Sequence, residues 1–507
     1  MSVSGPSPDH QQVVPERRRR LLILGICSMS LLIVGLDSTI VNVALPAIHR
    51  SFPSSLAGLQ WTIDAYTLVV ASLLMFFGST ADRLGRRRVF QVGLTVFSLG
   101  SLLCAIAPSL ELLVAFRVLQ AIGGAMLNPV ALSIVRNVFV DPRERARAIG
   151  VWGAVFGISM ALGPVLGGFL ISAISWRAIF LVNLPFGALA ITLTALFVPE
   201  SRAARPRRID PVGQLLVILG LGLLTYAIIE GGRVGFGTTR IPILLALAIA
   251  CLGTLVVYEL HRREPLLEMR FFRSAPFAGA SLIAVCLFAA TGGFLFLTTL
   301  YLQDVRGLSP LHAGLYLVPM AAMMIVFAPV SGRLVSNFGA RVPMVVGGLA
   351  VLACGLMLTT LAPGTSVPYL FGAYVLFGLG SGLVNPPITN TAVSGMPPGQ
   401  AGVAGAVAST SRQVGVTLGV AMLGAVAGGG LSGDIGRGFA EATRPAWWIV
   451  AGLGLAVSVV GYVSTTSWAR GTARRTAERL EGAEVAPDAA ALQPAPGSPL
   501  ERVANRA

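Results

Sequence analysis

Long apolar stretches recur along the whole chain and are separated by short polar segments. At 1.5 Å per residue, about 20 residues of helix cross the ~30 Å hydrocarbon core of a bilayer. The apolar stretches of this length predict fourteen transmembrane helices, and therefore an all-α polytopic membrane protein. They lie near 21–46, 58–79, 89–107, 109–134, 147–171, 178–198, 213–230, 241–260, 277–301, 309–331, 342–361, 368–390, 402–428 and 446–467.

The composition agrees with this pattern. Hydrophobic residues make up 54% of the 507 positions and charged residues only 12%, whereas a soluble domain carries about a quarter charged residues. The net charge of +15 comes from arginines, because the chain has no lysine. These arginines gather between the apolar stretches, which is typical of loops at a membrane face and not of a nucleic-acid-binding patch. We therefore expect the lipid bilayer, and no nucleic acid, as a partner.

The distribution of arginine predicts the orientation, because positive loops are retained in the cytoplasm. Alternate loops and the two tails hold 28 arginines, and the opposite loops hold seven. Both termini are therefore predicted to be cytoplasmic in a multi-pass protein of the cell membrane. The two remaining arginines, Arg117 and Arg412, lie inside predicted spans.

The chain also repeats itself. The loop that starts at Gly78 recurs 254 residues later in the chain. The pair Asn128 and Pro129 recurs after 257 residues, and the row of glycines beginning with Gly150 recurs after 252 residues. Near-equal offsets imply two six-helix halves related by an axis along the membrane normal, with the substrate site at their interface near the membrane midplane, as in many transporters. The expected organisation is a cytoplasmic tail (1–20), a first bundle (21–198), a linker with two extra transmembrane helices (199–276), a second bundle (277–468) and a disordered cytoplasmic tail (469–507).

Several motifs occur in a fixed order between 21 and 468. They are 36–46 (LDSTIVNVALP), 61–66 (WTIDAY), 78–88 (GSTADRLGRRR), Arg117 with Gln120, 163–168 (GPVLGG), 176–180 (WRAIF) and 411–415 (SRQVG). Together they closely resemble the fourteen-helix drug:proton antiporter branch of the major facilitator superfamily, which includes exporters of quaternary ammonium compounds and methylenomycin. The resemblance implies the major facilitator fold, with two six-helix bundles and two inserted helices.

Asp37 lies within the first apolar span, where an ionisable side chain costs at least ~2.5 kcal/mol and usually serves function. Burial and solvation move the pKa of a carboxyl in opposite directions, so a carboxyl that alternates between wet and dry surroundings can bind and release a proton. We predict Asp37 to be the proton carrier. The competing interpretation is a carboxylate that caps a neighbouring helix.

Asp64 lies near the start of the second span, between Trp61 and Tyr66. A carboxylate flanked by aromatic rings suits an organic cation. In the alternative interpretation, Trp61 and Tyr66 anchor the helix at the membrane interface and Asp64 faces solvent.

The arginines within the spans are candidates as well, because arginine stays charged there. Arg117 is predicted to act with Asp37 in proton coupling, and Gln120 lies one turn further on the same helix face. Asn42, Gln120, Arg412 and Gln413 complete the predicted substrate-binding residues, together with Asp64, Trp61 and Tyr66.

Two glycine-containing motifs predict gating. In the loop 78–88, glycines permit a tight turn, and Asp82 can pair with an arginine in one conformation and lose that contact in another. Arginine as a topology signal alone would not explain Asp82 or the glycines. In the fifth span, glycines allow close helix approach and proline removes a helical hydrogen bond. The predicted gating residues are Gly78, Asp82, Arg83, Gly85, Arg86, Gly163, Pro164 and Gly167.

The leading hypothesis is a proton-coupled antiporter that exports drugs, antibiotics or other small amphipathic compounds, with cationic compounds among them. The alternative is a dedicated exporter of one secondary metabolite made by the host. An ATP-driven pump is disfavoured, because a chain without lysine has no phosphate-binding loop of the Gly-x-x-x-x-Gly-Lys type. An enzyme is disfavoured as well, since the histidines are scattered and the cysteines lack metal-ligand spacing. We therefore expect no cofactor and no metal, the proton gradient as the energy source, and a monomer.

Overall fold

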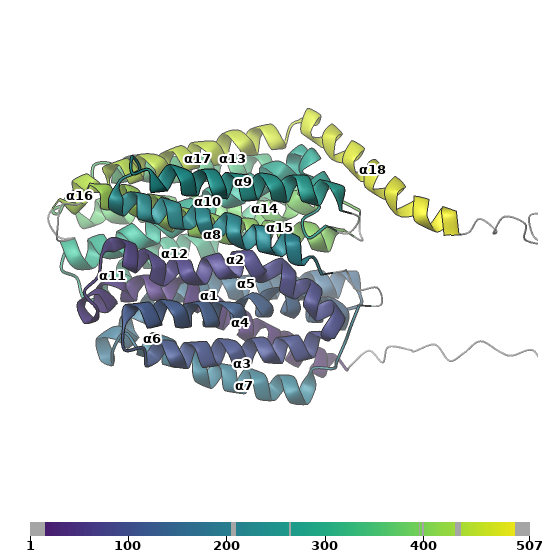
Figure 1. The fold of residues 1–507 in the computed structure, drawn as a ribbon, viewed down its shortest axis with the longest axis horizontal. Helices are drawn as coiled ribbons and strands as arrows, with labels where there is room; N and C mark the ends of the chain where they lie inside the picture. The colour runs from purple at the N-terminus through teal and green to yellow at the C-terminus, as the bar shows by residue number, and fades with distance from the viewer. Residues whose placement is uncertain are drawn as a thin grey trace, which may run out of the picture.

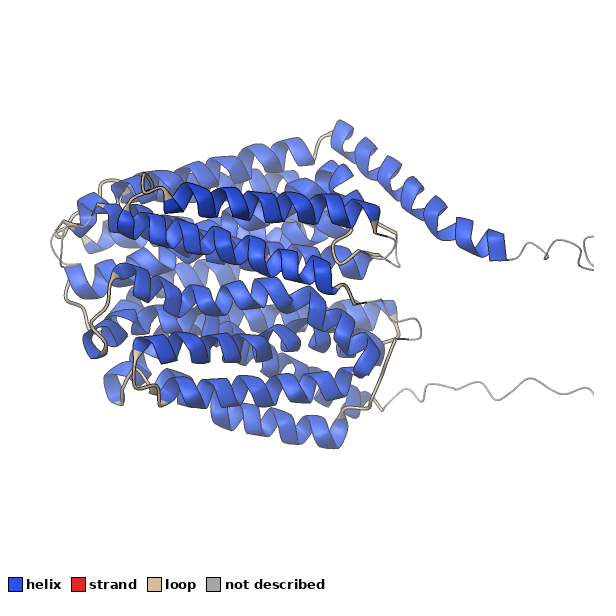
Figure 2. Ribbon diagram, viewed as in Figure 1, coloured by secondary structure: helices blue, strands red, loops and turns tan. Residues whose placement is uncertain are grey.

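The computed structural model describes residues 16–203, 209–262, 265–394, 396–397, 400–430 and 438–491. Within these ranges every regular element is a helix (Figure 2). Thirteen helical stretches there are long and apolar enough to cross a membrane. The fourteenth expected span is helix α15 (Ala401–Gly429), whose polar segment around Arg412 lowers its hydropathy. The predicted all-α class is confirmed, and the number of spans agrees with the fourteen expected.

The first half contains the first six spans, with the sixth broken into two helices. Its elements are α1 (Arg17–Ser51), α2 (Leu56–Leu84), α3 (Arg86–Ala105), α4 (Leu110–Val138), α5 (Pro142–Ala173), α6 (Ala178–Leu181) and α7 (Asn183–Phe197). They form the lower part of the bundle in Figure 1.

The linker contributes two long helices, as expected, and the second half follows. The linker elements are α8 (Pro211–Val234), α9 (Arg240–His261) and the short η1 (Met269–Arg273). The second half consists of α10 (Ala275–Leu300), η2 (Tyr301–Val305), α11 (Pro310–Tyr316), α12 (Val318–Phe338), α13 (Arg341–Leu358), α14 (Val367–Val393), α15, α16 (Phe439–Ala442) and α17 (Arg444–Ser464).

Both the start of α1 and the last helix, α18 (Ser467–Ala491), lie at one end of the bundle, on the right in Figure 1. We call this the terminal end and the other the opposite end. An even number of spans requires this arrangement. Which end faces the cytoplasm stays a prediction from the arginine distribution.

Local sequence explains where the helices begin and end. Ser55 caps α2 by accepting a hydrogen bond from the backbone of Gly58, and Asp141 caps α5 in front of a proline at the first helical position. Both are the residue types preferred there. Between α2 and α3, Gly85 has a φ of 115°. A side chain rarely adopts this conformation, so the glycine makes the sharp turn possible.

The hydrophobic core differs between the two ends. One cluster of buried side chains runs from Ile40 and Leu45 of α1, through Leu59 of α2, to Leu287 of α10 and the stacked rings of the second half. A second cluster is confined to the first half. The larger apolar core shared by the two halves therefore lies toward the opposite end, and toward the terminal end Met75 of α2 also packs against side chains of the second half.

The inserted helix α8 lies against both halves (Figure 1). Its Gln214 side chain donates a hydrogen bond of 2.8 Å to the backbone carbonyl of Ser72 in α2. On its other side, Gly232 lies so close to Ala425 of α15 that a Cβ at this glycine would collide with the α15 backbone. Helix α8 therefore covers the seam between α2 and α15.

The carboxyl-terminal segment differs from the prediction, because much of the tail predicted to be disordered from residue 469 forms helix α18. Ala469, Ala473 and Leu480 fall on one side of this helix and are buried, with Leu480 packed near Phe271 and Phe277. The intervening arginine, glutamate and alanine residues are good helix formers. Residues 492–507 lie outside the described residues.

The amino-terminal boundary also moves. Helix α1 begins at Arg17 and not at 21, because Arg20 forms an ion pair of 2.5 Å with Glu144 of α5. The first 15 residues of the predicted tail lie outside the described residues.

Candidate functional site

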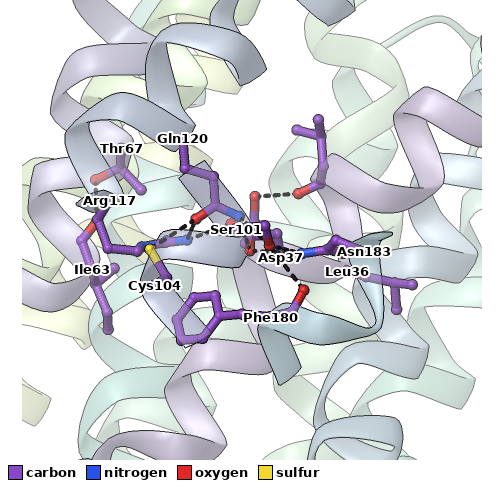
Figure 3. Close-up of polar contacts among 12 residues, drawn as sticks. Leu36, Asp37, Ile63, Thr67, Ser101, Cys104, Arg117, Gln120, Phe180 and Asn183 are labelled. Atoms are coloured by element: carbon purple, nitrogen blue, oxygen red, sulfur yellow. Dashed lines mark hydrogen bonds and ion pairs between the residues drawn. The ribbon is translucent and has the colours of Figure 1, made fainter. Parts of the chain in front are cut away.

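Asp37 and Arg117 form a buried ion pair between α1 and α4 (Figure 3). The Nη1 group of Arg117 lies 2.6 Å from Oδ2 of Asp37, and the two side chains are 1% and 0% exposed. A buried charge without a partner is strongly unfavourable, whereas a hydrogen-bonded pair is tolerated. The sequence prediction that Arg117 is the partner of Asp37 is confirmed, while their role in proton coupling stays a prediction.

Polar side chains from three further positions complete this cluster. Gln120 donates from Nε2 to Oδ1 of Asp37 at 2.9 Å and accepts from Arg117 at 2.7 Å. Asn183, at the start of α7, donates to Oδ1 of Asp37 at 3.5 Å and to Ser101 at 2.9 Å. Ser101 of α3 in turn donates to the backbone carbonyl of Phe180 at 2.9 Å. Gln120, predicted to bind substrate, is therefore placed on the Asp37 carboxyl.

Sequence reasoning assigned no role to Ser101 or Asn183. Both are polar residues inside predicted apolar spans, and Asn183 follows the 176–180 motif. That signal could have marked them as members of a buried network, because buried polar groups are almost always hydrogen-bonded.

Tyr66 lies against the same pair. Its ring centroid is 4.2 Å from the guanidinium carbon of Arg117, which is a cation–π contact. Gly124 of α4 leaves room for the Tyr66 hydroxyl, because a Cβ atom on residue 124 would lie only 2.7 Å from the hydroxyl oxygen. The structure thus places Tyr66, predicted to bind substrate, on the arginine of the ion pair.

Asp64 is fully buried, so the alternative in which it faces solvent is wrong. The reason is that its face of α2 packs inside the bundle and not at the membrane interface. Neither carboxylate oxygen has a hydrogen-bond partner among the described residues. The nearby Thr67 hydroxyl instead donates to the backbone of Ile63 at 3.5 Å and accepts from Thr417 of α15 at 2.9 Å. Asp64 therefore offers an unsatisfied carboxyl that a cation or a proton would satisfy.

The remaining residues predicted to bind substrate are spread over both halves. Trp61 lies 6.2 Å from the ring of Tyr226 on α8. Asn42 is buried, and its Oδ1 has no hydrogen-bond partner among the described residues. Arg412 donates to the Thr389 hydroxyl of α14 at 2.5 Å, and Gln413 next to it is half-buried. The structure does not bring Arg412 and Gln413 to the Asp37 cluster.

The predicted gating loop is held by contacts within the first half. Asp82 accepts hydrogen bonds of 3.1 and 2.9 Å from Arg86. Glu200, which follows α7, accepts from the backbone of Arg87 at 3.2 Å and lies against Gly85. Gly78 faces Pro129 of α4, whereas Arg83 is exposed.

The glycines of the fifth span lie where α5 meets its neighbours. A Cβ on Gly163 would collide with Thr39 of α1, and one on Gly167 would stand 2.6 Å from Ile40. The Pro164 carbonyl packs against Gly314 of α11 in the second half. Gly150, Gly153 and Gly157, in the other half of α5, have no neighbouring atom within 4 Å of a Cβ. The glycines of α5 are therefore in close contact with neighbouring helices only toward the opposite end.

Sequence reasoning missed the polar contacts that join the two halves. Gln303 of η2 donates a hydrogen bond of 2.9 Å to the backbone carbonyl of Val43. Gln60 of α2 donates to the carbonyls of Val420 and Ala421 in α15, at 3.0 and 2.9 Å. These bonds close the opposite end around the apolar core described above. Among the described residues, no group of three or more histidine, cysteine or acidic side chains could hold a metal ion.

Comparisons with known proteins agree with this architecture. The sequence profile of the Major Facilitator Superfamily matches residues 27–420. The chain is 39% identical over 420 residues to the multidrug resistance protein Stp of Mycobacterium tuberculosis, which covers 82% of this chain and 78% of that protein. It is 37% identical over 420 residues to the tetracenomycin C resistance and export protein of Streptomyces glaucescens, with the same shares covered.

A solved structure has a similar fold. The bacterial homologue of the human lysosomal transporter Spinster, in an inward-facing and unoccupied conformation, superposes with a TM-score of 0.62 at 19% identity. The match covers 92% of this chain and 99% of that one. The family profile and the resistance proteins confirm the resemblance carried by the sequence motifs. The chain is a multi-pass membrane transporter that belongs to the Major Facilitator Superfamily, in the branch of its drug and antibiotic resistance exporters.

Proposed function

We propose that the protein is a proton-coupled antiporter that exports drugs, antibiotics or other small amphipathic compounds across the cytoplasmic membrane. The observation that supports this most directly is the 2.6 Å ion pair of Asp37 and Arg117, buried within two membrane spans. Ionisable side chains inside spans are rare and mark proton and substrate pathways. The proton gradient supplies the energy in this proposal, and no cofactor takes part.

Protonation of Asp37 is the first step. A neutral carboxyl no longer attracts the guanidinium of Arg117 by charge, so the ion pair weakens. Arg117 also donates a hydrogen bond of 3.2 Å to the backbone carbonyl of Thr62 in α2. A shift of Arg117 toward or away from Asp37 therefore changes a contact of the helix that carries Asp64.

Asp64 receives the substrate in this mechanism. Its carboxyl is buried and has no hydrogen-bond partner among the described residues, so a cationic group at this position would be favoured electrostatically. Trp61 and Tyr66 flank it in the sequence and add aromatic surface for an amphipathic molecule. Asn42 and Gln413 contribute polar contacts in the proposal.

The hydrogen bonds between the halves at the opposite end and the free space beside Gly150, Gly153 and Gly157 of α5 support a rocking cycle. If the terminal end faces the cytoplasm, as the arginine distribution predicts, this conformation takes up substrate from inside the cell. Export then requires the bonds of Gln303 and Gln60 between the halves to break and the glycines Gly150, Gly153 and Gly157 to gain neighbours. We propose that a single chain completes this cycle.

A dedicated exporter of one secondary metabolite is the second candidate. The similarity to the tetracenomycin C resistance and export protein favours it, because that relative is named for a single antibiotic. A panel of dyes, biocides and antibiotics, tested for resistance in a host that lacks its own pumps, separates the two candidates. Resistance to several unrelated compounds supports a multidrug exporter, and resistance to one compound supports a dedicated one.

Proton coupling is tested with the purified protein in proteoliposomes under an imposed pH gradient. Asp37→Asn keeps the size of the side chain but cannot exchange a proton. We expect proton-driven export to be abolished while the variant still inserts and purifies as the wild type does. Unchanged export by Asp37→Asn would reject the assignment.

A further inference from the structure

Arg412 is a membrane-embedded cation without an acidic partner. The seven ion pairs formed by the described residues do not include it. The acidic residues described in the second half are Asp304, in η2, and Glu441, in α16, and both elements lie at the opposite end. Arg117, the other arginine within a span, has Asp37. The second half therefore carries an uncompensated positive charge in its interior.

The surroundings of the guanidinium are those of a binding subsite. One Nη group donates to the Thr389 hydroxyl of α14 at 2.5 Å, and the guanidinium carbon lies 5.8 Å from the ring centroid of Phe288 in α10. The Nε group is buried and has no hydrogen-bond partner among the described residues. Donors are thus left for a ligand, beside an aromatic face.

The position of Arg412 is also suited to substrate. Arg412 follows the first residue of α15 by eleven positions, which places it ~16 Å along the helix and far from its ends. The side chain is only half-buried, and Thr389 and Asn390 next to it on α14 are exposed. The guanidinium is held beside Phe288 of α10 and Thr389 of α14, and the backbone of Arg412 lies near the middle of α15.

We propose that Arg412, with Thr389 and Phe288, forms an anion subsite that accepts a carboxylate or phenolate of an aromatic substrate. Arginine recognises such groups through paired N–H donors, and the ring of Phe288 packs against the aromatic body. The inference rests on the proposed export function and assigns a second chemical class to its cavity. The first half offers a carboxyl at Asp64 and the second half a cation at Arg412.

The two charges are separated along the bundle axis by a length that one molecule can span. The Thr67–Thr417 hydrogen bond sets the register of α2 against α15. Asp64 precedes Thr67 by three residues on α2, which places it toward the opposite end. Arg412 precedes Thr417 by five residues on the antiparallel α15, which places it toward the terminal end. At 1.5 Å per residue the two positions are therefore ~12 Å apart along the bundle axis. An amphoteric aromatic compound of this length would contact both halves, and each charged end would also be recognised alone.

The test uses two xanthene dyes of similar shape and opposite charge, the anionic fluorescein and the cationic rhodamine 6G. Their binding to the purified full-length protein is measured by fluorescence anisotropy, which requires no proton gradient. We expect Arg412→Gln to weaken fluorescein binding at least tenfold and to change rhodamine 6G binding less than twofold. Arg412→Lys, which keeps the charge but loses the planar donor set, should give an intermediate loss.

Arg333→Gln is the matched control, because it removes an exposed arginine from α12 in the same half and should change neither dye. Size-exclusion chromatography establishes that each variant is folded. Fluorescein binding that is absent in the wild type, or equal in the wild type and Arg412→Gln, would overturn the subsite. If the wild type exports rhodamine 6G, the proposed export function stands even when the fluorescein result rejects the anion subsite.

Discussion

Arg117 donates a hydrogen bond of 3.2 Å to the backbone carbonyl of Thr62, two residues before Asp64 on the same helix. The same side chain holds the carboxylate of Asp37 at 2.6 Å. One arginine therefore contacts both the predicted proton carrier and the helix that carries the predicted substrate carboxyl. This is a direct physical route by which a proton on α1 can influence α2, because no intermediate side chain is required.

Arg117→Gln should uncouple export from the proton gradient. Without the guanidinium, the carboxyl of Asp37 loses its counter-charge in a buried site, so a proton on Asp37 no longer changes an ion pair with α4. Export against a concentration gradient should fall at least roughly tenfold, whereas downhill flux of the same dye persists. Transport in proteoliposomes with and without an imposed pH gradient measures both. Equal losses of uphill and downhill flux would indicate damage to the fold and not to coupling.

Asp64→Asn should discriminate between substrates by charge. The amide keeps the volume of the side chain and removes its attraction for a cation, so export of rhodamine 6G should fall by roughly tenfold or more, equivalent to about 1.4 kcal/mol. A neutral dye of similar size should be affected much less. Initial export rates of the two dyes from proteoliposomes give the comparison. Equal losses for both would contradict a cation-selecting role.

Gly163→Val should disrupt the contact of α5 with α1, because the new side chain would collide with Thr39. Overpacking of this kind costs about 1–3 kcal/mol. We expect a lower thermal midpoint in detergent and a loss of export. Gly153→Val is the matched control on the same helix, since a Cβ there has no neighbour within 4 Å. If the two variants had the same thermal midpoint, the packing role of Gly163 would be refuted.

Gln60→Leu should favour opening at the opposite end. The substitution removes two hydrogen bonds from α2 to the α15 backbone and leaves carbonyls that water can satisfy once the halves separate. The measurement is the labelling rate of a cysteine placed at Ala44, which is buried in the core shared by the halves. A variant without the five native cysteines provides the background. Faster labelling than in the unsubstituted chain is expected, and slower labelling would show that Gln60 does not hold this end closed.

Much of the fold could be predicted from the sequence because a bilayer imposes a length and a polarity on each span. The pairing of Asp37 with Arg117 was predictable for a related reason, since an ionisable side chain in hydrocarbon requires a partner. The rotation of each helix about its own axis was not predictable, because apolar residues surround these helices on all sides. For this reason the burial of Asp64 and the placement of Tyr66 on Arg117 could not be derived.

Contacts between halves were missed for a different reason. Gln303 and Gln60 donate their hydrogen bonds to backbone carbonyls. Every residue has such a carbonyl, so the identity of the accepting residue gives no signal in the sequence. Helix α18 was missed because its buried stripe of Ala469, Ala473 and Leu480 is too narrow and too weakly apolar to stand out among arginines. Only the neighbouring Phe271 and Phe277, distant in sequence, make that stripe a packing surface.

The position of α8 constrains how the transporter moves. A hydrogen bond joins this helix to Ser72 of α2 on one side, and on the other side Gly232 packs directly against the backbone of Ala425 in α15. Because α8 packs on α2 and α15 at once, rocking of the two halves must change at least one of these contacts, and a side chain added at Gly232 should slow turnover.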